Sequence, residues 1–328
     1  MKPFHLALAF VSLAPMAMAE TPVLTVLTYD SFAADWGPGP AIAKGFEETC
    51  ACKVTYVTAG DGAAVLSRLQ MEGAGSAADI VLGLDTSLTE TARATGLFAP
   101  LVAQAPNDLP VPFSDATFEP FDWGWFAFVY DNTKLTMPPK SFQELAASDL
   151  KILIQDPRSS TPGLGLVMWV KAAYGDQSAQ VWQDLADNIV TVTPSWDAAY
   201  GLFLKGEADM VLSYTTSPAY HLIAEKDPTK SAATFDEGHY MQIEVAGKLA
   251  SSKHQALADQ FLAYLASDAA QSVIPTTNWM YPAKTPATGL PVGFETLIKP
   301  EKSLLLSSVD AEESRKAAVE EWQTVLSK

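Results

Sequence analysis

Short apolar runs rich in β-branched residues alternate with amphipathic segments along the first third of the chain. The runs predict strands at residues 23–29, 52–58 and 78–84. The amphipathic segments predict helices at residues 41–48, 63–71 and 87–96. Strands that alternate with helices in this way indicate a parallel sheet with right-handed crossovers.

The middle of the chain repeats this alternation. It predicts strands at residues 151–155, 189–193 and 210–212. It predicts helices at residues 163–174, 179–187 and 197–205. A second α/β unit therefore follows the first, and the length of the chain agrees with two domains.

Two further strands are expected to connect these units. Residues 123–130 are too apolar and aromatic for a surface edge, and residues 240–246 alternate apolar and polar side chains. We interpret both as strands that cross between two lobes. The predicted division is lobe I at 20–122 and 246–328 and lobe II at 123–245, with a charged C-terminal helix at 311–327 that packs on lobe I. The fold class is thus α/β, with two mostly parallel sheets flanked by helices and joined by crossing strands.

The N-terminus has the pattern of a secretory signal peptide. Lys2 precedes an apolar stretch at residues 5–16, and the A-x-A motif ending at Ala19 predicts cleavage there. No later stretch is apolar for long enough to span a bilayer, so we expect an exported, soluble protein.

The chain is acidic, with 21 basic and 38 acidic residues and a net charge of −17. Such a charge makes nucleic acid or an anionic membrane surface a poor partner and would attract a cationic small ligand. The two cysteines, Cys50 and Cys52, are expected to form a disulfide in an oxidising compartment, with a redox role as the minor alternative. No Cys/His spacing typical of a zinc site and no nucleophile motif occurs.

Hydroxyl, carboxylate and aromatic side chains gather where the predicted parallel strands end, the edge at which α/β folds bind ligands. Two lobes with such edges face each other across a cleft. Aromatic faces attract cations, Asp accepts from amino groups, and hydroxyls at a helix start bind polar oxygens. The pattern therefore indicates a flat, cationic ligand with an amino group and a hydroxyl or phosphate tail. For each turn taken alone, capping and core packing remain the simpler explanation.

Several long runs resemble a known family. They are TYDSFAADWGPGP from Thr28, ADIVLGLD from Ala78, QDPRSSTPGLG from Gln155, YGLFLKGEADMVLSYTTSPAYH from Tyr200 and NWMYP from Asn278. Together they are similar to the periplasmic thiamine-binding proteins of ABC transporters, which are type II periplasmic binding proteins. The resemblance implies a monomeric, non-enzymatic periplasmic shuttle without a cofactor. It would carry thiamine or its mono- and diphosphate to a membrane permease.

The resemblance also implies a set of ligand contacts. Asp61 would bind the aminopyrimidine beside Gly62, and the rings of Trp196, Tyr220 and Trp279 would sandwich the heterocycles. Two turns would hold the hydroxyethyl or phosphate end. The first contributes the hydroxyl groups of Ser160 and Thr161, and the second contributes Tyr214, Thr215, Thr216 and Ser217. Tyr29 and Trp36 are expected as further stacking partners.

Three other interpretations stay open at this point. A ferric-ion carrier of the same architecture could use Tyr214 and Tyr220 as ligands but would leave the Trp residues unexplained. A polyamine carrier would need more carboxylates in the turns. An exported hydrolase lacks the G-x-S-x-G and S-x-x-K motifs with suitable partners.

Overall fold

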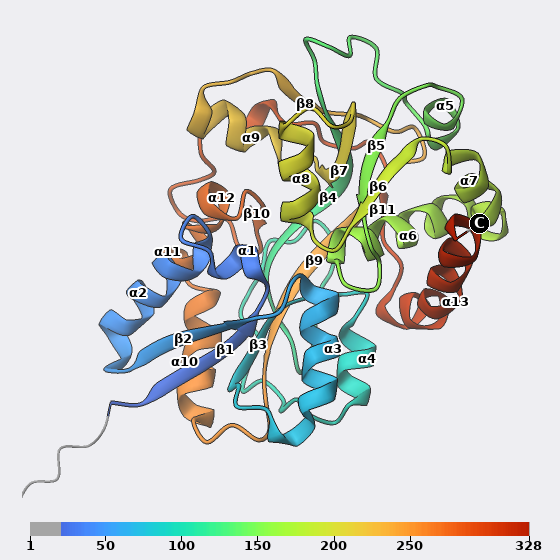
Figure 1. Cartoon of the computed structure of the whole chain (residues 1–328). Helices are drawn as coiled ribbons and strands as arrows, with labels where there is room; N and C mark the ends of the chain where they lie inside the picture. The colour runs from blue at the N-terminus through green and yellow to red at the C-terminus, as the bar shows by residue number, and fades with distance from the viewer. Residues whose placement is uncertain (1–20, 328) are drawn as a thin grey trace, which may run out of the picture.

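One mixed sheet runs through both halves of the protein, as the computed structural model of residues 21–327 shows (Figure 1). Within these residues the sheet has eleven strands, in the order β2-β1-β3-β9-β4-β7-β5-β6, with β8 and β10 beside β4 and β11 beside β9. The strands are β1 Val23–Thr28, β2 Lys53–Thr58, β3 Ile80–Asp85, β4 Glu119–Asp131, β5 Ile152–Gln155, β6 Ile189–Thr193, β7 Met210–Tyr214, β8 Lys230–Ala232, β9 His239–Lys248, β10 Tyr281–Pro282 and β11 Ser303–Leu304.

The helices cover the faces of this sheet in each half (Figure 1). In lobe I they are α1 Asp30–Ala33, α2 Pro38–Cys50, α3 Gly62–Glu72, α4 Thr89–Ala94, α10 Gln255–Leu265, α11 Asp268–Gln271 and α12 Ile274–Thr277. In and against lobe II they are α5 Phe142–Ala146, α6 Thr161–Tyr174, α7 Ser178–Leu185, α8 Trp196–Leu204, α9 Pro218–Tyr220 and α13 Ser308–Leu326. Four single turns complete the set: η1 Gly73–Gly75, η2 Gly175–Gln177, η3 His221–Glu225 and η4 Phe294–Thr296.

The two long central strands confirm the predicted crossing segments. The β1 strand pairs in parallel with β2 and β3, and β5 pairs in parallel with β6 and β7, so each lobe keeps a parallel core. Between these cores β4 and β9 run antiparallel, and β4 continues from β9 onto β7 at Phe126. The predicted boundaries at 122/123 and 245/246 therefore fall inside continuous strands.

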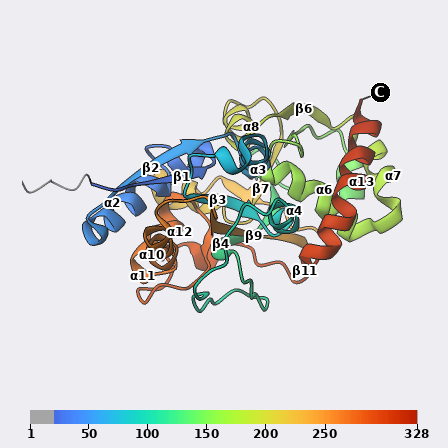
Figure 2. The ribbon, with the colours of Figure 1, turned by 90° about the horizontal axis from the view of Figure 1, so that it is seen from below.

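The C-terminal helix corrects one expectation. We predicted that it packs on lobe I, but α13 lies mainly against α6 and α7 of lobe II and also contacts α4 of lobe I (Figure 2). Near its middle the Arg315 guanidinium donates to Thr91 of α4, and near its end Glu321 accepts from Ser178 of α7. Helix α13 therefore spans both lobes on the outside of the molecule.

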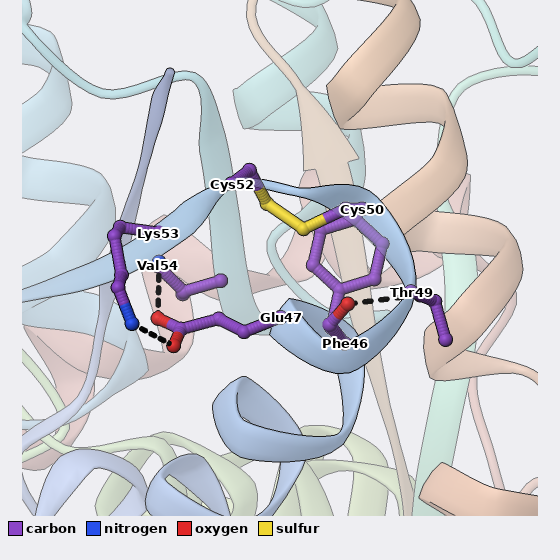
Figure 3. The surroundings of a disulfide bond; sticks show 7 residues. All are labelled: Phe46, Glu47, Thr49, Cys50, Cys52, Lys53 and Val54. Atoms are coloured by element: carbon purple, nitrogen blue, oxygen red, sulfur yellow. Dashed lines mark hydrogen bonds and ion pairs between the residues drawn. A yellow bond between two sulfur atoms is a disulfide. The ribbon is translucent and has the colours of Figure 1, made fainter. Parts of the chain in front are cut away.

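The predicted disulfide is present between Cys50 and Cys52, whose Cα atoms lie 5.2 Å apart. It closes the turn from α2 to β2, with Ala51 in the left-handed region at φ 50° (Figure 3). Beside it Glu47 accepts hydrogen bonds from the Val54 amide and the Lys53 ammonium. In residues 21–327 no helix is both long and apolar enough for a membrane span. The predicted signal peptide lies outside the described residues.

Candidate ligand-binding site

A cavity of about 480 Å³ lies between the two lobes. Three helices begin at its wall, α3 at Gly62, α6 at Thr161 and α8 at Trp196. Each follows the C-terminal end of a parallel strand, which is where the sequence placed the site. The wall is formed by Tyr29, Ser31, Trp36, Asp61, Gly62, Thr161, Pro162, Trp196, Asp197, Tyr200, Gly201, Leu204, Tyr214, Ser217, Tyr220, Glu244, Thr276, Asn278, Trp279 and Met280.

Aromatic rings dominate the wall and come from both lobes. The Trp196 indole stacks on Tyr200 with ring centroids 5.1 Å apart, and Tyr220 meets Trp279 edge to face at 5.3 Å. Trp279 has a φ of 56°, an uncommon backbone conformation for a bulky residue and one that clusters at functional sites. Trp36 is 52% exposed, so a ring that enters the cavity would meet it near the surface.

The end of β7 and the turn after it hold the Trp196 indole. The Trp196 Nε1–H donates to Ser213 Oγ at 2.8 Å, and Ser213 Oγ lies 2.6 Å from Ser217 Oγ. The Tyr214 amide also donates to Ser217 Oγ. These bonds orient the indole at the cavity wall. Of the hydroxyl groups predicted here, those of Thr215 and Thr216 are fully buried and do not line the cavity.

A carboxylate bridges the two lobes at one edge of the cavity. Asp61 Oδ2 accepts a hydrogen bond from Ser160 Oγ at 2.5 Å and another from the Trp196 amide at 2.9 Å. Next to it the Gly62 amide donates to Thr161 Oγ1 at 3.1 Å. Burial raises the pKa of Asp61 to about 6, against the lowering effect of its two hydrogen bonds. We call this set of contacts the Asp61 bridge, and it joins the two lobes at this edge of the cavity.

The floor of the cavity is polar and belongs to the crossing strands. The Tyr29 hydroxyl donates to Glu244 Oε2 at 2.9 Å, and Gln242 Nε2 donates to Glu244 Oε1 at 2.6 Å. Tyr214 donates to Gln242 Oε1 at 2.8 Å. Glu244 is only 6% exposed, and this remaining surface faces the cavity. The floor therefore presents a carboxyl group that accepts from one aromatic hydroxyl and one side-chain amide.

The structure brings most of the predicted residues to the wall. Those that line it are Tyr29, Trp36, Asp61, Gly62, Thr161, Trp196, Tyr214, Ser217, Tyr220 and Trp279. Three predicted residues do not line it, namely Ser160, Thr215 and Thr216. Ser160 is buried, and its hydroxyl donates to Asp61.

Sequence reasoning missed Glu244, Tyr200 and Asn278 among the lining residues. Glu244 could have been found from the sequence, because an ionisable residue in the middle of a strand predicted to be central and buried is a candidate for a binding site. Tyr200 carried no such signal. It lies four residues after Trp196 on α8, and only this helical spacing brings the two rings together.

One group in the described residues has the spacing of metal ligands, but its donors already bind protein groups. His221 Nδ1 lies 2.6 Å from Glu225, its Nε2 lies 2.9 Å from the Tyr200 hydroxyl, and Asp227 accepts from the Thr229 amide. Burial lowers the pKa of His221, so a neutral imidazole supports Tyr200 from behind. We interpret this group as structural support for the cavity wall.

Comparison with known proteins agrees with this geometry. Residues 35–272 match the model of the family described as bacterial extracellular solute-binding protein. A thiamine-binding periplasmic protein of Salmonella typhimurium is 54% identical over 310 residues, which cover 94% of each chain. A solved periplasmic thiamin binding protein is 50% identical, covers 97% of this chain and 100% of its own, and superposes with a TM-score of 0.92.

More distant structures share the fold alone. A ferric binding protein from Campylobacter jejuni is 18% identical, covers 92% of this chain and 99% of its own, and has a TM-score of 0.74. Among the proteins named above, only the thiamine-binding proteins match this chain in fold, over nearly the full length and at about half of the residues. The chain belongs to the bacterial extracellular solute-binding proteins and, within them, to the family of periplasmic thiamine-binding proteins.

Proposed function

We propose that this protein binds thiamine in the cavity between its lobes and delivers it to the membrane permease of an ABC importer. The observation that carries the proposal is the interlobe cavity, whose aromatic wall comes from both lobes and whose floor is a buried carboxyl group. Thiamine has two flat heterocycles, an amino group and a permanent positive charge, and these match the wall and the floor.

The proposed roles follow from where the residues lie. Trp196, Tyr220 and Trp279 offer ring faces for the heterocycles, with Tyr29 and Trp36 at the floor and near the surface. Thr161 and Ser217 are the hydroxyl groups for the hydroxyethyl end. The starts of α3, α6 and α8 would favour a phosphate there, which supports thiamine mono- and diphosphate as further ligands.

Delivery requires that the permease can distinguish the loaded protein from the ligand-free protein. Closure around the ligand would bring Asp61 to Ser160 and Trp196, so the Asp61 bridge would form most completely in the loaded protein. We propose that the chain works as a monomer in the periplasm without a cofactor or catalysis, after export and cleavage behind Ala19. N-terminal sequencing of the secreted protein tests the cleavage site.

Titration of thiamine into ligand-free protein tests the main proposal. We expect one saturable site in calorimetry together with a change in tryptophan fluorescence. In Trp196→Ala the affinity should fall by about 1–3 kcal/mol because stacking and apolar burial are lost. Trp123→Phe is the control, because Trp123 stacks on Tyr281 away from the cavity, and its affinity should match wild type.

Ferric ion and spermidine are the competitor ligands in the same titration. Saturable binding of either one, with no heat and no fluorescence change for thiamine, would overturn the proposal. The distant iron-binding relatives give the ferric alternative no support beyond the fold, and an iron site would leave the indole rings of the wall without a role.

A further inference from the structure

Three carboxyl groups lie side by side on neighbouring central strands below the cavity. Asp85 of β3 is paired with Glu244 of β9, and Glu244 is paired in turn with Asp122 of β4. Residues paired across strands project from the same face of a sheet. The three form a row that we call the acid row, and each of its members is at most 6% exposed.

The hydrogen bonds of the acid row come from neutral donors. Glu244 accepts from Tyr29 and Gln242. Asp122 Oδ2 accepts from Asn278 Nδ2 at 2.5 Å, and Asp85 Oδ1 accepts from the Ser87 amide at 2.9 Å. Asp122 Oδ1 is buried and accepts from no amide, hydroxyl or amine among the described residues, and within the row the Asp122 and Glu244 side chains share a hydrogen bond. In residues 21–327 no ammonium or guanidinium forms an ion pair with any of the three.

Arg315 of α13 is the basic group that acts on the row from outside, through its charge on Asp85. Its guanidinium hydrogen-bonds to Glu312 and Thr91 and forms no ion pair with a member of the row. Burial raises the pKa of Asp85 and of Asp122 to about 7. Burial first, and then the charge of Asp122, raises the pKa of Glu244 well above its ordinary value.

Like-charged carboxyl groups at adjacent positions in a dry site cannot all ionise, so they hold protons until a positive charge arrives. Of the three only Glu244 lines the cavity. None of the described lining residues is Lys, Arg or His, so the protein itself brings no positive charge to this floor. A cation bound in the cavity would supply the missing charge.

We propose that Glu244, backed by Asp85 and Asp122, is the counter-charge for a cationic ring of the ligand and selects it over an uncharged ring of the same shape. This inference rests on the proposed function, because it names the group in the thiamine site that recognises charge. It adds a specificity-determining residue to the stacking residues, which bind charged and uncharged rings alike.

The test compares thiamine with an analogue in which a neutral thiophene ring replaces the thiazolium ring. Both ligands are titrated by calorimetry into wild type and Glu244→Gln. We expect wild type to prefer thiamine by about tenfold or more, because only the charged ring is attracted by the negative charge of the Glu244 carboxylate. We expect Glu244→Gln to lose most of this preference, through weaker thiamine binding.

Glu119→Gln is the matched control. Glu119 is a buried carboxyl on β4, burial raises its pKa to about 7, and it accepts from the Ala105 amide away from the cavity. Its ligand preference should equal that of wild type. Equal affinity of wild type for the two ligands would overturn the inference without any variant, and so would an unchanged preference in folded Glu244→Gln. Failure of wild type to bind thiamine at all would instead overturn the proposed function.

Discussion

Single residues of this protein have roles that depend on partners far away in the chain, and Asp61 is the clearest case. The family resemblance implied that Asp61 contacts the ligand, and Asp61 does line the cavity. Its Oδ2, however, already accepts from Ser160 and Trp196 of the other lobe. Those partners lie 99 and 135 positions later, and no local pattern in the sequence links them. The residue was therefore predictable as part of the site, but its bridging contacts were not.

Removal of the Asp61 carboxylate should favour the open arrangement of the lobes. Asp61→Ala deletes both hydrogen bonds of the bridge, so we expect thiamine affinity to fall by about 1–3 kcal/mol and the loaded protein to be more expanded. Calorimetry measures the first effect and small-angle scattering the second. Asp156→Ala is the control, because its carboxylate binds Arg158 within its own turn. A loaded Asp61→Ala protein as compact as wild type would contradict the bridging role.

At the scale of elements, apolar runs and their spacing predicted the long strands and helices well. They did not predict β8, β10 and β11, which have two or three residues and exist only because β4 and β9 pair with them. The position of α13 was also wrong, since a charged helix with a narrow apolar stripe gives little indication of which lobe it covers. Such features are decided by tertiary packing, which one local segment does not encode.

Strand β3 contains a glycine that determines where Tyr29 can lie. Gly83 has a φ of 96° at a bulge between β3 and β9, and an added Cβ would meet Tyr29 Cδ1 at 2.2 Å. Gly83→Ala should therefore destabilise the protein by about 2–4 kcal/mol through backbone strain and overpacking. Displacement of Tyr29 should weaken ligand binding as well. Urea unfolding and calorimetry measure the two effects.

The matched substitution is Gly75→Ala, where φ is ordinary and no atom lies within 4 Å of the added Cβ. It should change neither stability nor affinity. If Gly83→Ala were as stable as Gly75→Ala, a glycine at position 83 would not be needed for Tyr29 to lie where it does.

For the whole molecule, the two-lobed fold followed from the repeated strand–helix alternation and from two strands too apolar for an edge. The sequence did not reveal that the crossing strands carry buried acids into the centre of the sheet. Glu244 was a polar position inside one predicted crossing strand and Asp122 lay just before the other, and only the pairing of β4 with β9 places them together. This arrangement affects the stability of the entire protein as well as its ligand.

Several buried groups hold protons that the unfolded chain would release. Burial raises the pKa of Asp61 to about 6 and that of Asp85, Glu119 and Asp122 to about 7. Because the native pKa exceeds the unfolded one, each acid stabilises the fold at low pH and loses this contribution as pH rises through 6 to 7. His239 acts in the opposite direction, since burial lowers its pKa to about 4. Its contribution is lost as pH falls below the ordinary histidine value.

The acids outnumber His239 and His221, the two histidines whose pKa burial lowers, and the net charge of −17 adds self-repulsion at higher pH. We therefore expect the free energy of unfolding of ligand-free protein to be larger at pH 5 than at pH 8, by several kcal/mol. Urea unfolding across this range measures it, and Asp122→Asn should reduce the slope because one titrating acid is removed. Saturating thiamine should also reduce the slope, since a cation beside Glu244 would stabilise the ionised acid row. A stability that rises from pH 5 to pH 8 would mean that these carboxyl groups are ionised in the native protein.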